Sequence, residues 1–391
     1  MKNAPPDQSG GAAMGSGRRA LHHATDTGRA SSRAGAGKVE GEPSALGPDH
    51  EVNVRGGPRV CQASYLFRLV NRLVPALAVL SSLLGLPSPV VQAQGLPAYS
   101  PINPVADSRT ALGFEPYRTP RLGGWGLGLS LDYGSAVELA LASRADYTLD
   151  AELLRLRLRV ARDLSPSVFL MADASAQGSY AGFLDGFLNW YHDLIGIRIK
   201  AREERPNDAF LYRLDLPGDS PRTRRPRALF LGDVRLAAGL RLGRHLQTLA
   251  LVTLPTSTGP AGYGRGVPAA GLIATVRAPL AEPLIYEGSL GLGYTPTHGD
   301  LEPYQHTTLV SGSSGLRWRF WGRQSLYANL FYHSPYYHDT TLPPLDRREL
   351  SLDFGWMLAT RSGKEWRIGM TEDMEPSGPA IDIVFRLGVA R

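Results

Sequence analysis

Apolar and polar residues alternate one by one over many short segments after residue 120. Residues 125–133 alternate Trp, Leu and Tyr with Gly, Ser and Asp, and residues 154–160 alternate Leu or Val with three arginines. Successive side chains of an extended strand point to opposite faces, so each such segment predicts a strand with one apolar and one polar face. Twelve strands are predicted, near residues 124–137, 150–162, 168–178, 228–242, 246–255, 269–279, 284–295, 306–320, 325–334, 347–360, 365–374 and 381–390.

The connections between these strands alternate between short and long. Short turns are expected near 163–166, 243–244, 279–282, 322–324 and 361–364, and long loops at 180–227, 256–268, 296–305 and 335–346. Short turns at one rim and long loops at the other are typical of outer-membrane barrels. We therefore predict an all-β fold, a transmembrane antiparallel β-barrel of about 12 strands with a short helical loop insertion.

A soluble sandwich or barrel would alternate in the same way, with its polar face toward water. The polar positions of these strands hold Gly, Ser and Arg beside acids, and the chain after residue 94 contains two lysines, Lys200 and Lys364. Water-exposed faces are usually richer in Lys and Glu, so the composition favours a membrane barrel with a wet lumen.

The first 93 residues predict segments that come before the barrel. Residues 1–58 are rich in Gly, Ala, Ser, Pro and charge, which predicts a disordered extension. Because signal peptides normally begin at the start of a chain, a further hypothesis is that translation starts downstream of Met1 and that this extension is not translated. Residues 59–93 combine arginines, an apolar stretch and a small-residue cleavage site, which predicts a signal peptide cut after Ala93. A single transmembrane helix is the alternative, although the apolar run falls short of the ~20 residues that a span needs. Residues 94–123 are then expected to form an N-terminal periplasmic segment, and residues 124–391 the barrel.

The formal charge of +6 does not indicate a nucleic-acid partner. Residues 94–391 hold 32 Lys or Arg and 30 Asp or Glu, so this part of the chain is close to neutral and lacks the basic footprint that binding DNA or RNA requires. A single cysteine excludes a disulfide framework and a cysteine-based zinc site.

One segment of the longest loop departs from the alternation. In residues 182–196, apolar residues fall at helical spacing, which predicts an amphipathic helix that plugs the barrel mouth or lies on the lipid headgroups. Asp185, Asn189 and His192 are three or four residues apart and share one edge of that helix. They are candidate ligand-binding residues; the alternative is that they cap and anchor the helix.

Arginines dominate the positions predicted to face the lumen. Taking every second residue of each predicted strand as inward places ten arginines and six acids there. The arginines are Arg155, Arg157, Arg159, Arg235, Arg241, Arg277, Arg317, Arg319, Arg367 and Arg386, and the acids are Asp132, Asp173, Asp233, Glu287, Asp353 and Asp382. Guanidinium groups lining a pore favour anions and bind carboxylate or phosphate through two hydrogen bonds. Arg155, Arg157, Arg159 and Arg235 are therefore candidate ligands for anionic solutes. The alternative is that arginines and acids pair with each other and fill a closed lumen.

Parts of the chain resemble a known family. The segment Ala181-Gly182-Phe183-Leu184-Asp185-Gly186-Phe187-Leu188-Asn189-Trp190-Tyr191-His192-Asp193-Leu194-Ile195-Gly196, the strand at 231–236 and the acidic pair Glu372-Asp373 before a closing strand are similar to domain-of-unknown-function family 3187 of Gram-negative bacteria. The resemblance implies an outer-membrane location and no particular activity.

These observations favour a passive channel or an envelope-structural barrel over an enzyme. The sequence contains no G-x-S-x-G, H-E-x-x-H or Walker motif. An outer-membrane barrel enzyme that hydrolyses lipids or esters stays open as the alternative, because a Ser and a His on different strands leave no local signature. We expect no cofactor and no metal. The expected partners are lipid, lipopolysaccharide, the barrel-assembly machinery and small anionic solutes, in the outer membrane of a Gram-negative bacterium.

Overall fold

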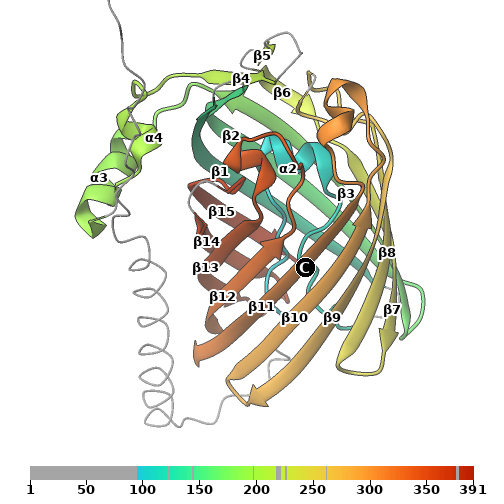
Figure 1. Cartoon of the computed structure of the whole chain (residues 1–391). Helices are drawn as coiled ribbons and strands as arrows, with labels where there is room; N and C mark the ends of the chain where they lie inside the picture. The colour runs from blue at the N-terminus through green and yellow to red at the C-terminus, as the bar shows by residue number, and fades with distance from the viewer. Residues whose placement is uncertain are drawn as a thin grey trace, which may run out of the picture. The chain divides into compact units, whose positions relative to one another are not determined.

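The computed structural model describes residues 95–391 except 121–123, 143–144, 197, 217–221, 225–226, 261 and 376–377. The predicted extension, signal peptide and cleavage site lie outside the described residues. Within the described chain, twelve strands form a closed antiparallel barrel (Figure 1). In order around the barrel they are β1 (Trp125–Ala142), β2 (Ala145–Asp163), β3 (Val168–Tyr180), β7 (Val234–Leu242), β8 (Leu246–Leu254), β9 (Ala269–Ala281), β10 (Leu284–Tyr294), β11 (Thr308–Trp321), β12 (Gln324–His333), β13 (Glu349–Ala359), β14 (Glu365–Asp373) and β15 (Ile383–Ala390).

The barrel closes where the first strand pairs with the last. β1 pairs with β15 from Gly128 opposite Ala390 to Ser135 opposite Ile383, so neither strand leaves a free edge. The twelve strands correspond to the twelve predicted from the alternation, and the antiparallel barrel is confirmed. The start of β1, the end of β15 and the short connections after β2, β7, β9, β11 and β13 lie at one rim, which we call the turn rim. The long connections after β3, β8, β10, β12 and β14 lie at the other, the loop rim, together with the connection from β1 to β2.

The alternation sorts side chains between the two faces of the wall. The large apolar residues of alternate positions point outward and are exposed, such as Trp125, Leu129, Leu158 and Leu290. Their polar neighbours point inward and are buried, such as Asp132 and Arg155. A soluble barrel would show the opposite arrangement, with apolar residues inside.

The loop rim carries the structure that lies outside the ring of twelve. The hairpin of β1 and β2 extends beyond the predicted strands, and its upper part pairs with β4 (Leu211–Asp215), which pairs with β5 (Arg222–Arg224). β6 (Arg227–Leu231) pairs with β3 below this extension, and a break at Gly232 and Asp233 separates it from β7. The helical segments in the connections are α3 (Asp185–Ile195), α4 (Lys200–Glu203), η1 (Gly299–Tyr304) and α5 (Pro343–Asp346).

The helix expected in the longest loop is present, and it lies against the outside of the wall (Figure 1). Leu188 of α3 packs on Ile383, and the ring of Phe187 lies 6.1 Å from that of Phe385 on the outer face of β15. Gly196 ends the helix with φ 71°, a left-handed conformation that glycine adopts without strain. Trp190 and Leu194 remain exposed on the other side of the helix. None of the helices in the described chain has the length and apolar character needed to cross a membrane.

Candidate functional site

The N-terminal segment, residues 95–120, lies inside the barrel. We expected residues 94–123 to form a periplasmic segment before the barrel; in the structure, residues 95–120 run toward the loop rim, form the short helix α2 (Pro104–Arg109) and return to the turn rim (Figure 1). Asn103 caps α2 by accepting a hydrogen bond from the Val105 N–H, and Pro104 occupies the first turn, as is common at helix starts. The lumen is therefore filled by the protein's own chain.

Hydrogen bonds to strands and loops of the wall hold this segment along its whole length. The Leu96 N–H donates to Glu287 at 2.7 Å, and Arg109 donates to the carbonyl oxygens of Thr295, Pro296 and His306. The remaining anchors include Thr110 with His333 (2.6 Å), the Tyr117 hydroxyl with the Gly243 carbonyl (2.8 Å), Tyr99 with Glu349 (3.1 Å), and the carbonyls of Gly95 and Ala98 with Arg317 and Arg367. Buried polar groups without partners are costly, so these bonds favour the docked position of the segment.

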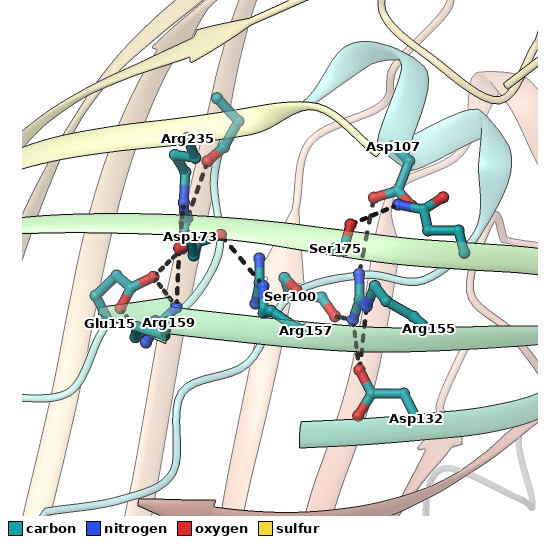
Figure 2. Close-up of polar contacts among 12 residues, drawn as sticks. Ser100, Asp107, Glu115, Asp132, Arg155, Arg157, Arg159, Asp173, Ser175 and Arg235 are labelled. Carbon is teal, nitrogen blue, oxygen red and sulfur yellow. Dashed lines mark hydrogen bonds and ion pairs between the residues drawn. The ribbon is translucent and has the colours of Figure 1, made fainter. Parts of the chain in front are cut away.

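The four candidate arginines lie together inside the barrel, and all four pair with acids (Figure 2). Arg155 contacts Asp132 at 2.8 Å and Asp107 of α2 at 3.8 Å. Arg157 contacts Asp173 at 3.3 Å. Arg155, Arg157 and Arg159 lie on β2, and their pairing with acids is the arrangement that the alternative interpretation describes.

Glu115 of the N-terminal segment completes this cluster. Its two carboxylate oxygens lie 2.8 and 2.9 Å from the two terminal nitrogens of Arg159, and it also pairs with Arg235. Arg235 in turn contacts Asp173 of β3 at 2.7 Å. Figure 2 shows Glu115, Arg159, Asp173 and Arg235 as one group. Four arginines thus face four acids, two from the wall and two from the segment.

Two cavities remain beside the cluster, and Arg157 lines both of them. The larger cavity, about 250 Å³, lies toward the turn rim against Gly388 and Arg391. The smaller, about 60 Å³, lies toward the loop rim against Asp233 and Arg265. The arginine cluster and the segment that bears Glu115 therefore separate a solute-sized space from the loop side.

The three candidate residues of α3 lie outside the barrel, away from the arginines. Asp185 is buried and accepts a hydrogen bond from Arg202 of α4 at 2.7 Å, and Asn189 is hydrogen-bonded to Asn207 at the surface. His192 is buried, with its Nε2 atom 3.5 Å from Asp382 Oδ1. Asp185 and His192 share one polar cluster, and Asn189 is not part of it.

This outer cluster lies between α3 and the wall. Arg202 bridges Asp185 and Asp382, and its third bond goes to the Ser135 hydroxyl at 2.9 Å. We predicted Asp382 to face the lumen, and this is wrong: it precedes β15 and turns to Arg202 and His192 on the outer side. Within the part of the chain that the structure describes, neither His192 ring nitrogen has a hydrogen-bond partner, and the Ser135 hydroxyl is bonded to Arg202, so Ser135 and His192 do not form a nucleophile–base pair. Burial lowers the pKa of His192 below its ordinary value.

Several residues of these two clusters are not predicted by the sequence pattern, because they lie in segments without alternation. Glu115 and Asp107 come from the N-terminal segment, and Arg202 comes from a four-residue helix. Glu372 lies next to His192 and Asp382; in the sequence it stands out only as part of the acidic pair Glu372-Asp373 of the family resemblance. The Asn103-Pro104 pair was a usable signal for a helix in the segment.

No family model and no curated protein sequence matches the chain. Among solved structures, the NanC porin is similar with a TM-score of 0.38 and 9% identity over 67% of this chain and 98% of that one. The Pseudomonas putida toluene transporter TodX gives 0.35 and 9% over 77% and 98%, and the translocator domain of the Neisseria meningitidis autotransporter NalP gives 0.36 and 12% over 69% and 88%. At these scores the similarities carry no argument about what this chain does.

Proposed function

We propose that the chain is an outer-membrane channel for small anionic solutes that is closed at rest by its own residues 95–120. The proposed location in the outer membrane of a Gram-negative bacterium agrees with the family resemblance, and the proposed barrel channel agrees with the architecture of the wall. The finer part, the solute class and the closure, comes from the arginine cluster.

The membrane location is supported by the outer surface of the wall. Leu272 of β9 and Leu290 of β10 are 59% and 71% exposed, and similar residues recur on the outer face of the other strands. Soluble proteins rarely expose large contiguous apolar surfaces, whereas a barrel in lipid requires an apolar band on this face. Closure of the barrel also satisfies the backbone hydrogen bonds that lipid cannot satisfy.

The observation that carries the anion proposal is the position of Glu115. A carboxylate delivered by the N-terminal segment accepts two hydrogen bonds from Arg159 and a third from Arg235. An anionic solute with a carboxylate or phosphate would make the same bonds to the same guanidinium groups. Glu115 therefore acts as an internal ligand in the resting protein.

Withdrawal of the segment changes the charge of the lumen at this level. Without Glu115 and Asp107, the arginines at 155, 157, 159 and 235 face two wall acids, Asp132 and Asp173. Unpaired guanidinium groups in a narrow pore concentrate anions and repel cations. The open state is expected to be anion-selective for this reason.

Reversal potentials in planar bilayers test the proposal. The mature protein should show rare openings under a salt gradient, and a variant that lacks residues 96–118 should conduct steadily with anion preference. Heat-modifiable migration on gels would verify that the shortened barrel is folded. A folded shortened barrel that does not conduct, or that prefers cations, would contradict the proposal.

A further inference from the structure

Three possible metal ligands converge beneath α3, outside the lumen. His192 comes from the third turn of α3, Glu372 from the outward face of β14, and Asp382 from the residue before β15. One ligand atom from each lies within 4.8 Å of the others, and His192 Nε2 is 3.5 Å from Asp382 Oδ1. Neighbouring ligands of a tetrahedral ion with bonds of about 2.1 Å lie about 3.4 Å apart, so this pair already has the required spacing.

Polar atoms of His192 and Glu372 are buried here without a hydrogen-bond partner among the described residues. These atoms are both ring nitrogens of His192, a residue that is 3% exposed, and Glu372 Oε2. Buried polar atoms in native proteins almost always have a partner, and an unoccupied ion site is one reason for an exception. The hydrogen bonds of the cluster join Arg202 to Asp185 and Asp382, and they do not involve His192 or Glu372.

Acidic side chains outnumber basic ones in the cluster. Asp185, Glu372 and Asp382 supply three carboxyl groups, and Arg202 supplies one guanidinium group through its bonds to the two aspartates. The bonds of Arg202 go to Asp185 and Asp382, so the Glu372 carboxyl is available to a cation.

We propose that His192, Glu372 and Asp382 bind a divalent transition-metal ion of the Zn²⁺ class. One imidazole nitrogen with two carboxylates suits Zn²⁺ and its neighbours in the first transition row, whereas Ca²⁺ and Mg²⁺ prefer all-oxygen sites. Three protein ligands leave a fourth tetrahedral position open, as in zinc sites that bind water or a substrate. The proposal is independent of whether the barrel conducts.

Binding would connect α3 to the wall. Trp190, two residues before His192, is exposed, and its ring lies 5.8 Å from that of Phe187. The bound ion would hold His192 on β14 and β15 and restrict α3 as a unit. Trp190 fluorescence is therefore a local reporter of binding.

Calorimetric titration of the full mature protein, stripped with chelator and refolded in detergent, tests the site. Zn²⁺ alone should bind with 1:1 stoichiometry, more tightly than Ca²⁺, and should change the emission of the wild type but not that of Trp190→Phe. His192→Asn and Glu372→Gln should each weaken binding about tenfold or more, since even the outer-shell partners of a metal are worth this much. Matched controls are His245→Asn in an exposed turn and Glu302→Gln in an exposed loop.

Heat-modifiable migration establishes that each variant is folded, which separates loss of a ligand from loss of the barrel. Absence of 1:1 Zn²⁺ binding to the folded wild type would overturn the proposal. Binding that survives both His192→Asn and Glu372→Gln would place the ion elsewhere and would overturn it too, as would a preference for Ca²⁺ that His192→Asn leaves unchanged.

Discussion

Glu115 and Arg159 form a two-bond ion pair inside the barrel, with Oε2 2.8 Å from Nη1 and Oε1 2.9 Å from Nη2. The residues are 44 positions apart, and the pair exists when the N-terminal segment lies in the lumen. Arg235 contributes to the same carboxylate from β7. The pair therefore links the position of the segment to the charge of the pore, and a change at residue 115 should affect both.

Replacing Glu115 with Gln should weaken the docking of the segment. The amide carries no charge, so Arg159 and Arg235 lose the carboxylate that they share and keep their contacts with Asp173. Removing one partner of a buried ion pair typically costs 3–5 kcal/mol; because Arg159 is partly exposed, we expect about 2–3 kcal/mol, or about 30- to 150-fold in the docking equilibrium. The rate at which trypsin cuts the segment after Arg118 in the folded protein measures this, with Glu302→Gln as the control. Equal rates in Glu115→Gln and wild type would contradict it.

Arg157 should contribute to selectivity once the segment is absent. It lines both cavities, and its acidic contact is a single aspartate, Asp173, which Arg159 and Arg235 share. In the variant lacking residues 96–118, Arg157→Gln should shift the reversal potential toward zero because one positive charge leaves the pore wall. Arg361→Gln, in an exposed turn outside the lumen, should leave the potential unchanged. An equal shift in both variants would indicate a surface effect and not the predicted pore site.

The barrel strands could be predicted because they are half apolar and half polar. The alternation identifies all twelve, and it fails at the upper ends of β1 and β2, where the inward residues Ala140, Tyr147 and Leu149 are apolar. On β2 the pattern is inverted there, because Asp150 and Glu152 lie on the outer face. The predicted strands are therefore shorter than the observed ones. Asp382 shows the related error: parity assigns a face only within a strand, and this residue lies just before one.

The contents of the lumen could not be predicted from the same pattern. The N-terminal segment has almost no regular structure, and much of its binding uses main-chain carbonyls, such as those of Gly95, Ala98 and Ser100 with wall arginines. Carbonyl groups exist in every residue, so they leave no signal in the sequence. Around the four candidate arginines, the predicted surplus of positive charge is balanced by Glu115 and Asp107, which arrive from this segment.

Gly239 of β7 should not tolerate a larger side chain. It faces Phe169 of β3, and a Cβ atom at residue 239 would lie 2.1 Å from the Phe169 ring. The ring is 1% exposed and Arg241 lies over it at 4.6 Å, so it has little room to move. Gly239→Val should destabilise the barrel by about 1–3 kcal/mol, as overpacking usually does. The temperature at which the folded gel band is lost should fall, whereas Ala238→Val on the outer face should leave it unchanged; a similar fall in both would contradict this explanation.

The contact between two loops at the loop rim should weaken as the pH falls. The His306 ring lies 4.8 Å from that of His338, and backbone bonds join the loops on either side, from His306 N–H to Tyr336 and from His338 N–H to Tyr304. Burial, and then the nearby His338, lowers the pKa of His306 below its ordinary value of about 6.5. When the two loops separate, His306 regains its ordinary pKa and binds protons more readily than it does in the closed contact. The closed contact is therefore fully favoured above about pH 6.5 and is lost progressively as the pH falls below that value.

Amide hydrogen exchange measures this contact directly. After correction for the intrinsic pH dependence of exchange, the amides of His306 and His338 should lose protection several-fold between pH 7.5 and pH 5, while strand amides of β10 and β11 keep theirs. His338→Gln removes the neighbouring imidazole and should reduce the loss, because part of the pKa shift of His306 comes from that ring. Protection that is the same at both pH values, or a loss that His338→Gln does not change, would show that the two histidines do not control the contact.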